Sequence, residues 1–120
     1  MEIFERDGKI NFVDENDIFI GFDYEQDCSQ SFGYYFTNMN PSEIEFDNEC
    51  RTVEGIKDYV FDPTFFKEIK GCDPEDNAAV FMMVNDKDVK YLVIYNSHNG
   101  YYSHGFAMSK REVILYDGDL

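Results

Sequence analysis

The chain has 120 residues with 12 Phe, 9 Tyr and no Trp, and its 25 acidic and 10 basic residues give a formal net charge of −15 at pH 7. A chain of this length forms one domain that buries enough surface to fold without a disulfide or a metal, and its many large aromatic side chains favour sheets. The charge disfavours nucleic acid and anionic membranes as direct ligands, because proteins neutralise phosphate with Lys and Arg, and no run reaches the ~20 apolar residues that span a bilayer.

The first part of the chain contains short apolar runs between polar turns, a pattern that predicts strands. The first three strands are expected over residues 9–13, 18–24 and 31–37. Asp7-Gly8 and the polar residues 14–17 supply the turns before the first and second strands, and Pro41 breaks the chain after the third. Apolar residues alternate along these runs, so one face of each strand is expected to line a core.

Residues 43–50 alternate acidic residues with other residue types. In a strand, this period of two puts Ile44 and Phe46 on one face and the carboxylates of the run on the other. The pattern is compatible with an edge strand whose charge blocks aggregation and with a surface that binds a cationic partner. Both roles stay open at this point.

Residues 51–72 give the weakest pattern, and a short helix is predicted inside them, over 64–69. Asp62 is suited to cap this helix and Pro63 to occupy its first position. Gly71 is then expected to end it.

The last third of the chain predicts strands joined by tight turns. These strands are expected over residues 77–85, 89–95, 101–108 and 113–116. Residues 86–88 form the turn between the first two, and Asn99-Gly100 is typical of a tight hairpin that returns the chain along 101–108. The fold class predicted for the single domain 1–120 is therefore α+β, predominantly an antiparallel β meander with one or two short helices.

Acidic residues are concentrated in the first part of the chain, where residues 1–76 hold 20 of the 25. No basic residue occurs between Lys9 and Arg51, an interval that holds ten acids. They are Asp14, Glu15, Asp17, Asp23, Glu25, Asp27, Glu43, Glu45, Asp47 and Glu49. Phe and Ile are interleaved with these acids, whereas a disordered acidic tail is poor in aromatic residues. We therefore expect folded strands with acidic turns and outer faces, and one strongly negative region of the surface.

Asp23, Glu25 and Asp27 alternate at the end of the second predicted strand. Calcium takes 6–8 oxygen ligands, but the stretch lacks the twelve-residue pattern of an EF-hand loop. A solvated acidic turn or a protein-binding patch is favoured over a metal site.

The three cysteines and two histidines are the remaining candidates for chemistry. The cysteines are Cys28, Cys50 and Cys72, which are widely spaced and expected to be reduced thiols. His98 and His104 flank the Asn99-Gly100 turn, but zinc sites need three or four ligands at short characteristic spacings, so no metal or cofactor is predicted. A His–His or Cys–His pair can cleave RNA, yet Lys110-Arg111 is the only adjacent basic pair and no phosphate-binding or hydrolase motif occurs.

Two fragments resemble a group of small phage- and plasmid-borne proteins of unknown function. Residues 23–31 resemble a His/Tyr-Glu-Gln-Asp-Cys-Cys-Glu motif, and residues 99–103 resemble a Ser-Asn-Gly-Tyr-Tyr-Ser turn near the C-terminus of the same group, in the same order and at a similar separation. The chain departs from the motif where Ser29 and Gln30 replace the second Cys and the Glu. This resemblance implies no activity.

In size, charge and architecture the chain is also similar to the immunity proteins of bacterial toxin systems, including contact-dependent growth inhibition. That similarity implies a small cytoplasmic protein that neutralises a nuclease toxin by covering its active site. A cytoplasmic location also agrees with the first seven residues, which are acidic and have no apolar run of the secretory type.

The leading hypothesis is an inhibitor or immunity protein that binds a basic protein, a nuclease toxin, without catalysis. Electrostatic steering would be followed by occlusion of a cationic active site, with carboxylates in the place of phosphates. Outward tyrosines are expected to anchor this interface. The predicted partner-binding residues are Asp23, Tyr24, Glu25, Asp27, Tyr35, Glu43, Glu45 and Asp47.

Two other functions stay open. A phage- or plasmid-encoded mimic of DNA would use the same charge against a restriction or defence enzyme, and requires carboxylates spaced like phosphates along an elongated surface. A small enzyme would use His98, His104 and one of the cysteines.

Overall fold

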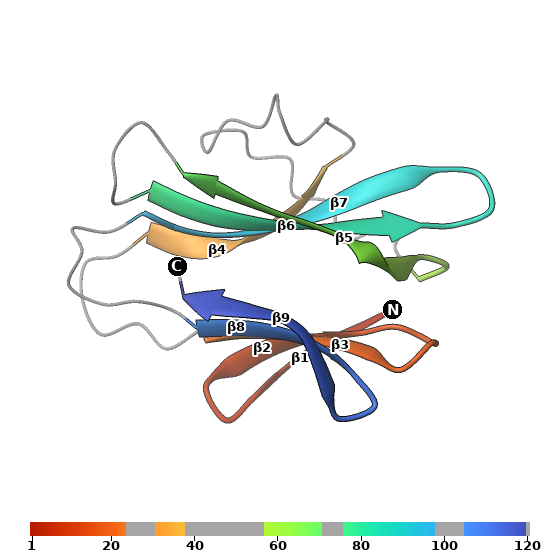
Figure 1. Cartoon of the computed structure of the whole chain (residues 1–120), viewed down its shortest axis with the longest axis horizontal. Coiled ribbons are helices and arrows are strands. Elements are labelled where there is room, and N and C mark those ends of the chain that lie inside the picture. The colour runs from red at the N-terminus through yellow and green to blue at the C-terminus, as the bar shows by residue number, and fades with distance from the viewer. Residues whose placement is uncertain (24–30, 38–56, 71–75, 98–104, 120) are drawn as a thin grey trace.

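The computed structural model describes residues 1–23, 31–37, 57–70, 76–97 and 105–119, which form two antiparallel sheets that pack face to face (Figure 1). Sheet A contains β1 (Glu2–Arg6), β2 (Lys9–Val13), β3 (Ile18–Asp23), β8 (Gly105–Lys110) and β9 (Val113–Asp119), in the order β1-β2-β3-β8-β9. Sheet B contains β4 (Ser31–Thr37), β5 (Val60–Lys70), β6 (Asp76–Val84) and β7 (Val89–Ser97), in the order β4-β7-β6-β5. The chain therefore changes sheet twice, between β3 and β4 and between β7 and β8.

Most of the predicted strands are confirmed. β2 and β4 have the predicted bounds, and β3, β6, β7 and β9 begin or end within a few residues of theirs. Asp7 and Gly8 have positive φ angles of 54° and 75°, as the tight turn between β1 and β2 requires. β1 was not predicted, because its charged residues hide the single inward Ile3, and the strand expected over 43–50 lies outside the described residues.

The predicted α+β class is wrong, because the described residues form strands and no helix. Residues 64–69, the expected helix, lie inside β5. The Asp-Pro signal is real, since Asp62 Oδ1 accepts hydrogen bonds from the Thr64 amide at 2.9 Å and the Thr64 hydroxyl at 2.6 Å. The turn that it makes is a bulge, however, because the register of β5 against β6 shifts between Phe61 and Phe66.

The residues that follow the bulge explain why the strand resumes. Phe66 points into the space between the sheets, where its ring stacks on Tyr116 at a centroid distance of 4.6 Å. Phe65 packs on the opposite face of sheet B, with its ring 5.7 Å from that of Tyr91. Extended backbone sends consecutive side chains to opposite faces, so a strand partly buries both rings.

The predicted single meander is also wrong. The strand expected over 101–108 was to return along 89–95, but β8 pairs with β3 and β9 in sheet A, whereas β7 pairs with β4 and β6 in sheet B. Asn99-Gly100 lies outside the described residues. The alternation of Phe106 and Met108 predicts one buried face but does not state which neighbour the strand pairs with.

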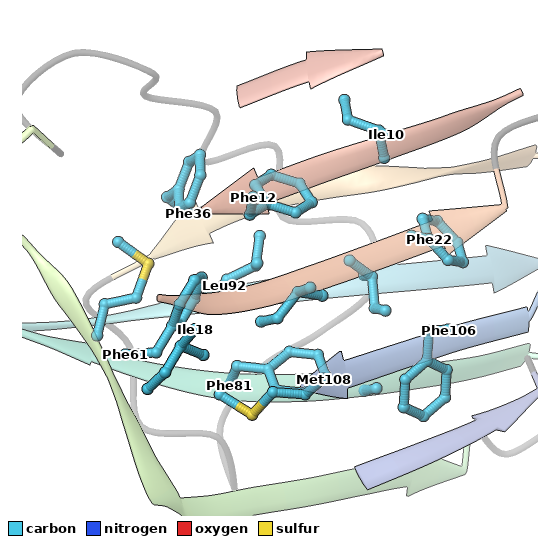
Figure 2. Packing of buried hydrophobic residues seen from close by; sticks show 14 of the residues in the cluster. Ile10, Phe12, Ile18, Phe22, Phe36, Phe61, Phe81, Leu92, Phe106 and Met108 are labelled. Atoms are coloured by element: carbon cyan, nitrogen blue, oxygen red, sulfur yellow. The ribbon is translucent and has the colours of Figure 1, made fainter. Parts of the chain in front are cut away.

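A core of apolar side chains fills the space between the sheets (Figure 2). Sheet A contributes Ile10, Phe12, Ile18, Ile20, Phe22, Phe106 and Met108, and sheet B contributes Phe36, Phe61, Ala79, Phe81, Met83, Leu92 and Ile94. Edge-to-face ring contacts cross the interface, such as that between Phe12 and Tyr34 at 5.1 Å. Each large apolar side chain that is fully buried contributes about 1.5–3 kcal/mol, so this core is the main source of stability.

One buried carboxylate connects the two sheets. Asp14 lies in the turn between β2 and β3 and is 5% exposed. Its Oδ1 accepts hydrogen bonds from the amides of Asn16 and Ile18, both at 2.9 Å, and its Oδ2 accepts one from the amide of Phe61 at 2.8 Å. Among the described strands β5 is an edge of sheet B, so the outward amide of Phe61 faces no described strand to which it could donate. Asp14 therefore satisfies an amide in each sheet at once.

Asp14→Ala is expected to lower the free energy of unfolding by about 3 kcal/mol, because buried backbone amides lose their acceptor. Urea unfolding curves measure this loss. Asp17→Asn, in the same turn but exposed, is the matched control and is expected to cost less than about 0.5 kcal/mol. Equal stability of Asp14→Ala and the wild type would contradict the role of Asp14.

The bulge in β5 makes an acid-sensitive contribution to stability. The hydrogen bonds from Thr64 hold the pKa of Asp62 below its ordinary value. A lowered pKa in the folded state means that the contribution is present above the unfolded value of 3.8 and is lost as the pH falls through the folded value.

The free energy of unfolding of the wild type, relative to that of Asp62→Asn, is therefore expected to be constant from about pH 5 to 7 and to fall below about pH 4. Urea unfolding at a series of pH values gives both curves. Parallel curves down to acidic pH would show that Asp62 does not titrate as the bulge requires.

Candidate partner-binding surface

Two of the eight predicted partner-binding residues, Asp23 and Tyr35, lie in the described part of the chain. The other six are Tyr24, Glu25, Asp27, Glu43, Glu45 and Asp47, and they lie outside it, as do both histidines and the three cysteines. The roles assigned to these residues from the sequence therefore remain predictions.

Tyr34 and Tyr35 point to opposite faces of sheet B, as the alternation along β4 predicts. Tyr34 packs against the core between the sheets. Tyr35 belongs to a second apolar cluster on the outer side of the sheet, where its ring lies 6.0 Å from that of Tyr95. The side chain of Tyr35 is 3% exposed, so it presents little ring surface to a partner.

The four described acids of the base-free run have different surroundings. Asp14 is buried and structural, and Asp17 lies 3.5 Å from the Arg111 guanidinium in an exposed ion pair. Glu15 is exposed beside them, whereas Asp23 lies at the other end of β3, about 17 Å away along the strand. These four carboxylates therefore do not form one cluster.

A hollow of about 990 Å³ lies on the outer face of sheet A, the lower face in Figure 1. The register of sheet A explains its shape, because one row of outward residues runs Phe4, Asn11, Gly21, Ala107 and Asp117 across the five strands. Small residues occupy the middle of this row. The outer face of sheet A is therefore lowest at its centre, and larger side chains rise on both sides of it.

Apolar side chains form the walls of the hollow. Phe4 on β1 and Ile114 on β9 are 38% and 61% exposed, so both present apolar surface to the hollow. Phe19 leans over Gly21, where a Cβ atom would lie 3.2 Å from its ring. Glycine at position 21 therefore allows the ring to lie against the strand.

Charged side chains lie at the ends of the hollow. Arg6 and Lys9 are on β1 and β2, and Asp117 is on β9. The strand order separates β1 from β9 by four strand spacings, about 19 Å. Asp23 lies opposite Lys9 in the register of β2 and β3. Positive and negative groups are therefore both present, with the bases on the β1 side and Asp117 on the β9 side.

Sequence reasoning missed this hollow for identifiable reasons. The alternation over 18–24 correctly put Phe19, Gly21 and Asp23 on one face of a strand, opposite the face of Ile18, Ile20 and Phe22. The predicted binding surface was instead centred on the acidic residues that follow Asp23. The prediction did not include β1, and it paired residues 101–108 with the wrong strand. It therefore could not place Phe4 and Ala107 in one row with Gly21.

A pair of titratable side chains at the end of sheet B has a structural role. The Tyr59 hydroxyl donates a hydrogen bond to Asp88 Oδ2 at 2.9 Å, and the Lys90 ammonium lies 5.5 Å from the centre of the Tyr59 ring. Burial, and then the hydrogen bond and charge of Asp88, raise the pKa of Tyr59 above its ordinary value. A raised pKa keeps the hydroxyl protonated, the opposite of what a catalytic base requires.

In the described ranges, no three His, Cys, Asp or Glu side chains come together in a way that would hold a metal ion. These ranges also contain no helix with the length and apolar composition that crossing a bilayer requires. Comparison of the chain with protein-family models, with curated proteins and with solved structures gives no match.

Tyr59→Phe is expected to lower the free energy of unfolding by about 1 kcal/mol at neutral pH, because Asp88 loses a hydrogen-bond donor. Since the folded-state pKa of Tyr59 is raised, its contribution is present below the unfolded value of 10.0 and is lost as the pH rises through the folded value. Urea unfolding at neutral and alkaline pH measures both effects. Equal stability of the two proteins at every pH would contradict this role.

Proposed function

We propose that this protein is an inhibitor that binds a basic protein, and that its partner is a nuclease toxin of the kind that immunity proteins neutralise. One observation carries the proposal: a net charge of −15 on a chain whose described residues fold into two sheets around an apolar core. Such charge has no role in forming the fold, and it opposes folding through self-repulsion. Binding to a cationic partner relieves this repulsion and makes the charge favourable.

Electrostatic attraction acts in two ways in this proposal. The field of the whole chain raises the rate at which a cationic surface meets the protein, and this effect falls with added salt. At contact, carboxylates occupy the positions that nucleic-acid phosphates take in the active site of the nuclease. The proposal puts the protein in the cytoplasm, where a nuclease that has entered the cell meets its substrate.

The mimic of DNA is the less favoured use of the same charge. It needs carboxylates in regular rows, but among the described acids Glu15 lies in the turn before β3 and Asp23 at the far end of that strand, with the apolar Phe19 between them. An inhibitor needs only a net field and a surface that fits one cleft, which agrees better with this distribution.

Affinity capture from the native host is expected to recover a basic protein whose association with this chain slows as the salt concentration rises. The decrease should be steep between low and physiological ionic strength, where the screening length shortens from ~30 to ~8 Å. Surface plasmon resonance at several salt concentrations measures the association rate. Recovery of no basic partner, or a rate independent of salt, would overturn the proposal.

Matched variants separate the predicted surface from the total charge. One variant carries Glu43→Gln, Glu45→Gln and Asp47→Asn, and the control carries Asp58→Asn, Asp86→Asn and Glu112→Gln at exposed acids outside the predicted set. Both lose three negative charges, so the loss of long-range steering is matched. We expect the first variant to bind at least about tenfold more weakly than the control, because it also loses direct ion pairs. Equal affinities would mean that these three acids have no special part in the interface.

A further inference from the structure

We infer that the hollow on the outer face of sheet A seats a protruding segment of the basic partner, with an apolar side chain over Ala107 and the Phe19 ring and a Lys or Arg side chain directed at Asp117. The inference rests on the proposed function, because it takes the partner to be a basic protein. It adds the place of contact and the chemistry of the segment that docks there.

The exposed apolar side chains support the seat for an apolar group. Phe4 and Ile114 stand at opposite sides of the hollow and are exposed, whereas the inward Ile3 and Leu115 of the same strands are partly buried against the core. Protein interfaces combine an apolar centre with a polar rim, and the hollow has both. Its volume of about 990 Å³ lies at the upper end of the range for ligand pockets, so it can admit a loop.

The charges of the hollow select the kind of segment. The hollow contains two bases, Arg6 and Lys9, and three acids, Asp7, Asp23 and Asp117. Arg6 lies 4.0 Å from Asp7, and Lys9 is opposite Asp23 in the register. Asp117 is exposed and has no cationic partner among the described residues, so it is the acid that an incoming cation meets.

A uniformly cationic segment fits this arrangement poorly, because its charge would meet Arg6 and Lys9 on the β1 side. A segment with an apolar residue beside a base avoids this repulsion. The apolar residue then covers the floor, and the base lies toward β9. The net charge of −15 attracts the whole partner, whereas the hollow determines which of its segments docks.

The floor is preorganised for this contact. Gly21 and Ala107 belong to β3 and β8, which are held in register by the neighbouring strands β2 and β9. The Asn11 amide nitrogen lies within hydrogen-bond distance of the carbonyl oxygens of Phe4 and Lys9, at 3.4 and 3.3 Å, and this fixes its side chain beside the floor. Little conformational entropy is lost when a segment binds to such a surface.

The test uses three acetylated and amidated pentapeptides, GRFRG, GRSRG and GEFEG, added to the full-length ¹⁵N-labelled protein at low ionic strength. GRFRG supplies the apolar residue and the bases, GRSRG lacks the apolar residue, and GEFEG reverses the charge. We expect GRFRG to shift the backbone amides of Gly21, Ala107 and Ser109 and to bind at least about fivefold more tightly than either other peptide.

Two matched pairs of variants identify the contact. Ala107→Tyr fills the floor with an outward side chain that strands tolerate, and Val89→Tyr makes the same kind of change at an exposed position of sheet B. Asp117→Asn and Asp86→Asn each remove one exposed negative charge, inside and outside the hollow. We expect Ala107→Tyr and Asp117→Asn to weaken GRFRG binding at least about fivefold and the two controls to change it less than about twofold.

The outcomes separate this inference from the proposed function. If GRFRG and GRSRG bind equally and shift amides only outside the hollow, or if Ala107→Tyr binds GRFRG as well as the wild type, the inference is overturned while charge-driven binding stands. If neither arginine peptide shifts any amide, the inference and the proposed charge-driven recognition are both overturned.

Discussion

The carboxylate of Asp14 joins the turn between β2 and β3 of sheet A to the edge strand β5 of sheet B. It closes the turn between β2 and β3 through the amides of Asn16 and Ile18, and it accepts the outward amide of Phe61 on the edge of sheet B. This contact helps to hold β5 in position against sheet A. Because the bulge begins directly after Phe61, the same contact determines where Phe66 enters the space between the sheets. Tyr116 then donates a hydrogen bond to the carbonyl oxygen of Pro63 inside the bulge, a second link between the sheets.

In our proposal the two faces of sheet A have different roles, the inner face in stability and the outer face in recognition. Its inner residues interdigitate with sheet B and bury large rings, such as those of Phe12 and Phe106. Its outer residues include Gly21 and Ala107, which leave a hollow where the other face is full. Since successive residues of a strand serve opposite faces, the packed core holds the hollow in shape. The proposal therefore predicts that substitutions in the floor change recognition without removing a core side chain.

The sequence predicted the local features of this structure better than the contacts between distant parts of the chain. Alternation of apolar residues located most strands, because burial of one face is a local property of a strand. The bulge in β5 could not be distinguished from a helix start, since Asp62 and Pro63 make the same cap in both. The sheet to which β8 belongs depends on contacts with β3, far away in the chain. Asp14 looked like any other acid of the run, because its partner Phe61 is 47 residues away. Six of the predicted binding residues lie outside the described part of the chain. Of the other two, Tyr35 is buried and Asp23 lines the hollow.

The central claim is that the acidic domain acts by covering the cationic active site of a nuclease. Steady-state kinetics of the captured partner, with a nucleic-acid substrate and increasing amounts of this protein, test that claim most directly. Occlusion predicts competitive inhibition, which raises the apparent KM for nucleic acid, leaves kcat unchanged and weakens at high salt. A partner that binds this protein and still cleaves its substrate at the unaltered rate would contradict the account.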